Sequence, residues 1–170
     1  MQAPSDMIDA LRAPGPRRSA DDPAQARIFD DFIGAWDMQY TFIQNDGSRR
    51  PAQGQVLAAW VLDGRAIQDL WIGVPPGQTE QWIGTTLRFY DAGLKAWRVT
   101  WIAPRARTIT LLTGGREGQR IVLNGETAQG KVRWSFNDIE RNGFNWKGEL
   151  SVDNGATWQL REDHVVRRAG

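Results

Sequence analysis

From residue 35 onward, apolar and polar side chains alternate along the chain with a period of two. The alternation is clearest over residues 36–42, where Trp36, Met38, Tyr40 and Phe42 occupy every second position. Side chains two residues apart lie on the same face of a strand, so this segment predicts a half-buried strand. Further strands are predicted over residues 55–62, 65–72, 82–90, 97–102, 107–113, 120–127, 131–139, 144–152 and 157–167.

These ten short segments follow one another with turn signals between them and without an intervening helix. Asp63-Gly64 and Asp153-Asn154-Gly155 are typical of tight hairpin turns. A run of sequential hairpins predicts an antiparallel meander, which can close into a barrel or fold into a sandwich. We expect an all-β, ten-strand antiparallel up-and-down barrel with one short N-terminal helix, because closure removes exposed sheet edges. The two-sheet sandwich is the alternative.

The segment before the first strand has helical spacing. Asp22-Pro23 is typical of a helix start, Phe29 and Ile33 lie on one helical face, and Gly34 ends the helix. Residues 1–22 are expected to form a flexible arm, in which Ser5 caps a short helix through Leu11 that the Pro-rich segment 14–16 breaks. The predicted division is therefore an arm over 1–22 and a barrel domain over 23–170, with the arm contributing little to stability.

Composition excludes several classes of function. The chain has 21 Lys+Arg, 20 Asp+Glu, no cysteine and one histidine, and its net charge is +1. The balanced charge argues against nucleic acid as a partner, and the lack of cysteine excludes disulfides and thiol chemistry. No apolar run is long enough to span a membrane, and residues 1–12 do not resemble a secretory signal. We expect a cytoplasmic protein without a metal or other cofactor, and with no membrane partner; a homodimer is left open.

Nine tryptophans in 170 residues are the strongest compositional signal. Several fall in phase on one strand face: Trp97 with Trp101, Trp134 with Phe136, and Phe144 with Trp146. They could form a filled aromatic core or the wall of a cavity. An eight-strand barrel is just filled or holds one small ligand, so ten strands should leave space. The residues expected to contact a ligand are Tyr40, Asp69, Tyr90, Trp97, Trp101, Trp134, Trp146 and Trp158.

His164 is the one histidine of the chain and lies on the last predicted strand. Trp158, Leu160 and Glu162 are in phase with it, so all four are expected to face inward together. A carboxylate and an imidazole two residues apart can share a proton, which makes Glu162 and His164 a candidate acid–base pair. A partly exposed, hydrogen-bonded His164 at the barrel mouth is the structural alternative.

Arg88 is the third candidate catalytic residue, and its facing is ambiguous. The apolar Leu87 and Phe89 would normally face the interior and leave Arg88 outside in a salt bridge. If Arg88 instead points inward, it can hold an anion or a carbonyl group. Asp69 poses the same question, because the strand that carries it is apolar on both faces.

The sequence Phe32-Ile33-Gly34-Ala35-Trp36 resembles the signature of lipocalins and their calycin relatives, a short helix followed by Gly-x-Trp at the first strand. The resemblance implies that Trp36 plugs the closed end of a barrel. Residues 32–167 are also similar in pattern to a group of uncharacterised bacterial barrel proteins, through the segments 62–65, 86–91, 97–101 and 134–136. The chain departs from secreted lipocalins in having no signal and no cysteines.

Haem-binding barrels of the nitrobindin kind place an iron-ligating histidine late in the chain, which implies haem at His164 as a minor alternative. Their Gly-rich segment after the Trp is missing here, since residues 37–40 contain no Gly. The main expectation is a soluble binder of a small hydrophobic or aromatic molecule in a Trp-lined cavity. The alternative is a cofactor-free isomerase, cyclase or lyase that uses His164 and Glu162. A structure in which His164 and Glu162 lie within hydrogen-bond reach of each other beside a cavity would favour the enzyme.

Overall fold

The computed structural model describes residues 6–20, 22–75 and 77–170. A short helix and two 3-10 helices come first: α1 Met7–Leu11, η1 Ala24–Arg27 and η2 Asp30–Phe32. Ten strands follow: β1 Gly34–Ile43, β2 Arg49–Val61, β3 Ala66–Gly73, β4 Trp82–Asp91, β5 Ala96–Ala103, β6 Thr108–Glu117, β7 Arg120–Thr127, β8 Gly130–Glu140, β9 Gly143–Ser151 and β10 Gln159–Arg168.

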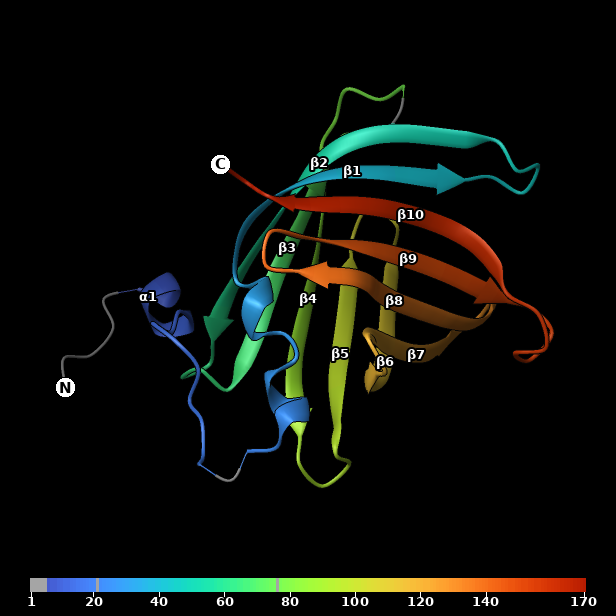
Figure 1. The fold of residues 1–170 in the computed structure, drawn as a ribbon. Helices are drawn as coiled ribbons and strands as arrows, with labels where there is room; N and C mark the ends of the chain where they lie inside the picture. The colour runs from blue at the N-terminus through green and yellow to red at the C-terminus, as the bar shows by residue number, and fades with distance from the viewer. Residues whose placement is uncertain (1–5, 21, 76) are drawn as a thin grey trace.

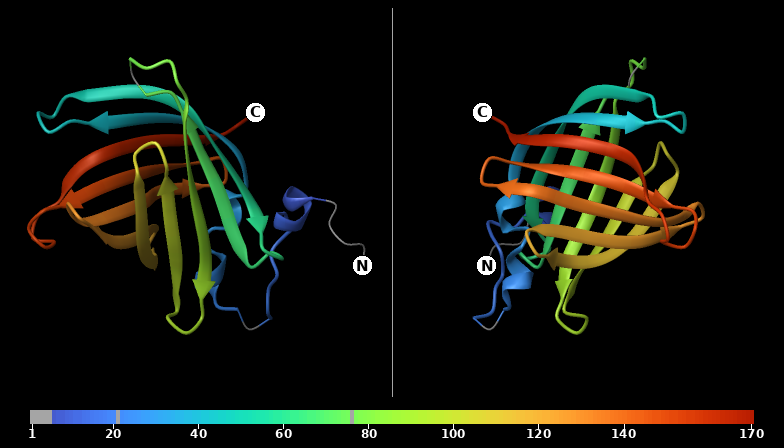
Figure 2. Two further views of the ribbon diagram at one scale, coloured as in Figure 1. Left: turned by 180° about the vertical axis from the view of Figure 1, so that it is seen from behind. Right: turned by 45° about the vertical axis from the view of Figure 1, so that its right-hand side comes forward.

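The ten strands form one closed antiparallel barrel (Figures 1 and 2). Each strand pairs with its neighbour in the chain, and β10 returns to pair with β1, with Trp36 opposite Arg168 and Tyr40 opposite His164. The expected ten-strand up-and-down barrel is therefore confirmed. Closure leaves no barrel strand with an unpaired edge, which removes the main aggregation hazard of an antiparallel sheet.

One end of the barrel is closed by aromatic side chains. Phe29 and Phe32, from the segment across that end, pack against Phe136 and Phe144 of the barrel wall at ring distances of 4.7–5.4 Å. Trp36 is also buried there, donates its Nε1–H to the Phe32 carbonyl at 2.8 Å and lies under the Arg168 guanidinium. The expected position of Trp36 at the closed end is confirmed, and the opposite end is left as the mouth.

The helix predicted between Pro23 and Gly34 is wrong in type. The segment forms η1 and η2, two short 3-10 turns, which lie across the closed end (Figure 1). The Asp22 carboxylate accepts a hydrogen bond from the Ser19 amide at 3.0 Å and caps no helix. Phe29, between the two turns, is fully buried against the barrel, so tertiary packing overrides the helical pattern. The helix α1 does form; its N-cap is Asp6, and the predicted cap Ser5 lies outside the described residues.

The segment after α1 contacts the β2–β3 hairpin. Arg12 forms an isolated antiparallel bridge with Val61, and the Ala13 amide donates to the Trp60 carbonyl at 2.9 Å. Further along, the Arg18 guanidinium lies 5.0 Å from the centre of the Trp60 ring and forms an ion pair with Asp30. The division into an arm and a barrel stays a prediction, and these contacts provide a test of it.

We expect two N-terminal truncations to behave differently. Removal of residues 1–10 should leave the melting temperature nearly unchanged, because the side chains of Met7–Ala10 are exposed. Removal of residues 1–20 should lower it by several degrees, because Trp60 loses the Arg18 contact and the backbone bonds of Ala13. Thermal unfolding followed by circular dichroism measures both, and equal melting temperatures for both truncations would show that the arm adds no stability.

Candidate functional site

A circuit of six aromatic rings surrounds the barrel interior between the closed end and the mouth. Neighbouring rings in the circuit lie 4.6–6.3 Å apart between centroids. The circuit runs through Tyr40, Trp82, Trp101, Trp134, Trp146 and His164, and returns to Tyr40. Trp71, from β3, reaches across the barrel to contact Trp146 and His164, each at 5.7 Å.

These rings enclose a small cavity, which we call the chamber. Its walls are Trp71, Trp82, Trp101, Trp134, Trp146, Glu162 and His164, and its volume is about 50 Å³. That is room for a few water molecules or for one end of a larger ligand. The barrel therefore has an internal space, although most of its interior is filled by side chains.

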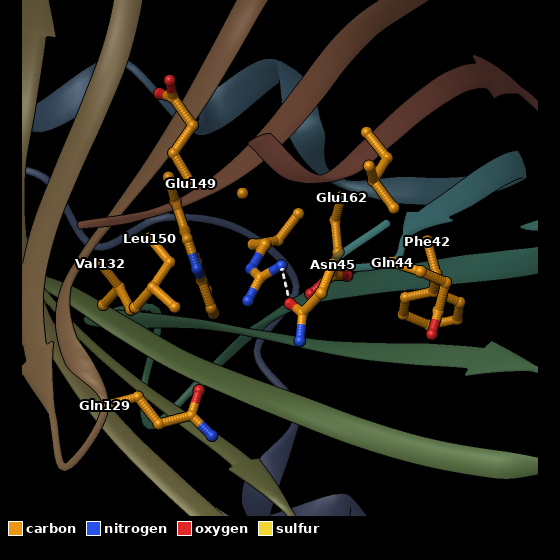
Figure 3. A pocket seen from close by; sticks show the side chains of 12 residues that line it. Phe42, Gln44, Asn45, Gln129, Val132, Glu149, Leu150 and Glu162 are labelled. Carbon is orange, nitrogen blue, oxygen red and sulfur yellow. Dashed lines mark hydrogen bonds between the residues drawn. The ribbon is translucent and has the colours of Figure 1, made fainter. Parts of the chain in front are cut away.

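A larger hollow, the vestibule, lies at the barrel mouth and shares Trp134 and Glu162 with the chamber. Its volume is about 370 Å³, which falls in the range of small-molecule pockets. Figure 3 shows Val132 and Leu150 on one side and Phe42 on the other. Asn45 accepts a hydrogen bond from the Arg161 guanidinium at 2.5 Å, drawn as the dashed line in Figure 3.

Inward-facing glycines make room for the tryptophans. Trp71 lies opposite Gly84 in the β3–β4 pairing, and Trp134 lies opposite Gly148 in the β8–β9 pairing. A Cβ atom at Gly84 would stand 2.0 Å from Trp101 Cη2, and one at Gly148 would stand 2.8 Å from Trp146 Cη2. Both glycines are therefore needed for the close approach of an indole.

We expect Gly84→Ala to destabilise the barrel. Trp101 is held between Trp82 and Trp134, so it cannot move aside without disturbing the circuit. Overpacking of this kind costs about 1–3 kcal/mol. Urea unfolding measures the loss, with Gly93→Ala as the control because its Cβ would meet only Asp91 Oδ1 at 3.3 Å. Adding Trp101→Leu to Gly84→Ala should restore much of the lost stability. If the double variant is no more stable than Gly84→Ala, the clash with Trp101 is not the cause of the loss.

His164 and Glu162 come together at the chamber. The His164 side chain is buried and its Nε2 lies 3.2 Å from Glu162 Oε2, whereas Glu162 is half-exposed toward the vestibule. The pair lacks the alignment of a hydrogen bond, and neither ring nitrogen has another partner among the described residues. The imidazole packs on Trp146 at 4.6 Å, so its surroundings are aromatic on one side and ionic on the other. This arrangement can pass a proton to or from a bound molecule.

Tyr40 lies beside this pair with its ring 5.8 Å from that of His164. Its hydroxyl donates to the Val74 carbonyl at 2.7 Å. Burial raises the pKa of Tyr40 above its ordinary value, so the phenol remains protonated at neutral pH. Tyr40 therefore supports His164 from behind the chamber walls and does not line the chamber itself.

Arg88 and Asp69 both face inward, which is the second of the two placements that the sequence left open. The guanidinium forms an ion pair with Asp69 and donates to Thr86 Oγ1 at 2.5 Å, and all three side chains are buried. Its face lies 4.7 Å from the centre of the Phe29 ring, at the closed end. Burial lowers the pKa of Arg88 to about 9, which still leaves it charged at neutral pH. Trp71 separates this pair from His164, because it lines both the chamber and the small void beside Arg88.

Like Asp69, two more of the predicted ligand contacts, Trp97 and Tyr90, lie away from the chamber. Trp97 is on the same strand face as Trp101 but at the closed end, where it packs on Phe29 at 4.9 Å and donates to the Gln25 carbonyl at 2.7 Å. Tyr90 packs on Trp97 at 6.2 Å. Both residues anchor the segment that closes the barrel.

Trp158 lies outside the barrel, so the expectation that it shares a face with His164 is wrong. A β-bulge between Leu160 and Glu162 shifts the register of β10 against β9 and reverses the alternation there. Trp158 precedes this bulge and stacks under the Arg133 guanidinium at 4.1 Å, on the outer face. After the bulge, Glu162 pairs with Gly148 and His164 pairs with Trp146. Glu162 and His164 therefore face inward together with these residues of β9.

Trp71 and Trp82 belong to the chamber, yet neither was among the predicted site residues. A signal for them was available in the sequence, because Trp71 is in phase with Asp69 and Trp82 is in phase with Gly84. Where Trp and Gly occupy inward positions on neighbouring strands, the glycine gives the indole room, and this pattern indicates a wall built of tryptophans.

Two kinds of feature are absent from the described residues. No group of three or more His, Asp and Glu side chains lies together in a way that could hold a metal ion. No helix in that part of the chain has both the length and the apolar character needed to cross a membrane.

The fold and the site together define a calycin-like barrel with an internal aromatic chamber. No known protein family and no curated protein matches the chain by sequence. The solved structures that share the fold include two calycin-like barrels. Rv2717c from M. tuberculosis has a TM-score of 0.66 and 11% identity, over 88% of this chain and 100% of its own. The S-type phycobiliprotein lyase CPES from Guillardia theta has a TM-score of 0.62 and 9% identity, over 85% of this chain and 92% of its own. The expected resemblance to calycin-like barrels is confirmed.

Proposed function

We propose that the protein binds a small, flat, hydrophobic or aromatic molecule through the chamber and the vestibule. The observation that carries the proposal is the circuit of aromatic rings around a cavity that shares two of its walls, Trp134 and Glu162, with a larger hollow. Aromatic side chains bind flat apolar groups by offset-stacked and edge-to-face contacts. The cytoplasmic location and the homodimer stay predictions.

The second candidate function is a cofactor-free enzyme in the same cavity. The observation that favours it is the 3.2 Å approach of Glu162 Oε2 to His164 Nε2 beside the chamber. One proton shuttle suffices for an isomerisation, a cyclisation or an elimination. In such a reaction His164 would hold or release the proton, and Glu162 would orient the imidazole. Arg88 would take no part, because Trp71 lies between it and the pair.

Haem does not fit the residues around His164. Trp71 and Trp146 pack on the imidazole at ring distances of 5.7 and 4.6 Å, and Glu162 lies against Nε2. A chamber of about 50 Å³ is far smaller than a porphyrin. A Soret band in the purified protein that is lost in His164→Ala would contradict this conclusion.

We expect aromatic ligands to quench the intrinsic fluorescence in a saturable way, because Trp101 and Trp134 line the site. Trp134→Leu should weaken binding about tenfold or more, since Trp134 is a wall of both compartments. Trp158→Leu is the matched control and should bind as the unmodified chain does, because Trp158 lies outside. Equal affinities for both variants, or no saturation with any aromatic ligand, would refute the proposal.

A further inference from the structure

The inner end of the chamber contains buried hydrogen-bonding groups without partners. Among the described residues, the indole nitrogens of Trp71, Trp82 and Trp146 and both ring nitrogens of His164 accept or donate no hydrogen bond. All four residues line the chamber, and Trp71, Trp146 and His164 are the most deeply buried of them, at 7%, 4% and 2% exposed. Proteins leave few buried polar groups unpaired, so such side chains around one cavity, the three most buried above all, call for a common explanation.

The chemistry of these groups restricts the missing partner. An indole N–H can only donate a hydrogen bond, and a neutral imidazole donates through one of its two nitrogens. The partner must therefore be an acceptor, and an oxygen atom that projects into the chamber would meet all three side chains. A plain hydrocarbon would leave each donor unpaired, which costs free energy.

The charges around the chamber argue against an anionic acceptor. Glu162 lines both the chamber and the vestibule, and its carboxylate lies against His164. The next buried charge, Arg88, is compensated by Asp69 on the far side of Trp71. In the vestibule, Glu149 is held by Arg133 through two bonds of 2.9 and 3.1 Å, whereas Arg161 is hydrogen-bonded only to the neutral Asn45. Arg161 lines the vestibule and not the chamber, so a carboxylate or phenolate inside the chamber would meet Glu162 with no cation among the chamber walls.

Size decides how such a ligand lies. The chamber, of about 50 Å³, accommodates an oxygen atom and little more, whereas the vestibule, of about 370 Å³, accommodates a ring system. Phe42, Val132 and Leu150 give the vestibule apolar walls for that body. We propose that the ligand is a neutral aromatic carbonyl compound, with its ring system in the vestibule and its carbonyl oxygen between the indole N–H groups of Trp71 and Trp146. This inference rests on the proposed function and deepens it.

Three probes of equal shape test the inference by calorimetric titration. Acetylnaphthalene has a neutral carbonyl group, isopropenylnaphthalene replaces that oxygen by carbon, and naphthoate has a carboxylate. We expect the ketone to bind about tenfold more tightly than the other two, which corresponds to one additional hydrogen bond of ordinary strength. Equal affinity for the ketone and the hydrocarbon, or tightest binding of naphthoate, would overturn the inference and leave the proposed function standing. No binding of any probe would overturn both.

Conservative variants separate donation from packing. Trp71→Phe and Trp146→Phe keep an aromatic ring and remove the N–H, so the preference for ketone over hydrocarbon should shrink while hydrocarbon affinity changes little. Trp158→Phe is the matched control and should keep the full preference. Proton NMR of the unmodified chain gives a second readout, in which the two indole N–H resonances shift downfield with the ketone and not with the hydrocarbon. Unshifted indole resonances would show that water alone is their partner.

Discussion

Asp69→Leu should lower the free energy of unfolding by about 3–5 kcal/mol, which is the usual effect of breaking a buried ion pair. The variant leaves the Arg88 guanidinium buried, charged and without its carboxylate. It also removes the acceptor of the Thr86 amide, which donates to Asp69 Oδ1 at 3.0 Å. The melting temperature should fall by about 10 °C for a chain of this size.

The double variant Asp69→Leu with Arg88→Met is the control for this result. Replacing both partners by apolar side chains of similar volume removes the uncompensated charge, so most of the lost stability should return. Urea unfolding of the two single variants and the double variant forms a complete cycle. If Asp69→Leu lowers the free energy of unfolding by less than about 1 kcal/mol, the ion pair of Asp69 and Arg88 is not buried in solution as it is in the structure. Neither variant should change the binding of an aromatic ligand by much, because Trp71 separates the pair from the chamber.

His164→Leu should leave the protein at least as stable as before, as measured by urea unfolding. The imidazole is 2% exposed and has no well-aligned hydrogen bond, so an apolar side chain of similar size removes a desolvated polar group at no cost in packing. We expect the free energy of unfolding to stay level or to rise by about 1 kcal/mol. His164→Ala should instead lower it by about 1–3 kcal/mol, because a cavity remains between Trp146 and Tyr40.

Glu162→Gln separates the binder from the enzyme. The change keeps the shape of a half-exposed side chain and removes the charge beside His164. For a binder, affinity for a neutral aromatic ketone should be unchanged and affinity for naphthoate should increase. For an enzyme, turnover should fall at least a hundredfold while ligand affinity is kept, since only the acid–base partner is lost. Full activity in Glu162→Gln would exclude the pair as the proton shuttle.

The sequence was sufficient to predict the barrel because its period-two alternation has one physical cause. Each strand buries one face and exposes the other, so the inward residues of β1 can be identified from Trp36, Met38 and Tyr40 without any knowledge of their partners. Where this cause is weaker, alternation left the facing of a side chain open. On β4 the apolar Phe89 is 41% exposed and Arg88 is buried, because Asp69 on the neighbouring strand compensates the charge. That compensation depends on a strand pairing that local alternation does not contain.

Two predictions were wrong, and both errors have the same origin in nonlocal contacts. The predicted helix after Pro23 is divided into η1 and η2 because Phe29 inserts into the barrel end. Trp158 was placed inside because an unbroken alternation was extended through Arg161, where the structure has a bulge. A bulge is a property of two paired strands, and a single strand gives no sign of it.

The sequence alone determined the class of fold, the closed end at Trp36 and the face on which most aromatic side chains lie. Only the tertiary structure decided how far along the barrel axis each of them stands. Trp97 and Trp101 share one face of β5, yet four residues of strand separate them by about 13 Å, so one seals the closed end and the other lines the chamber. Depth in a barrel is set by the stagger between neighbouring strands, and that stagger follows from all ten pairings together.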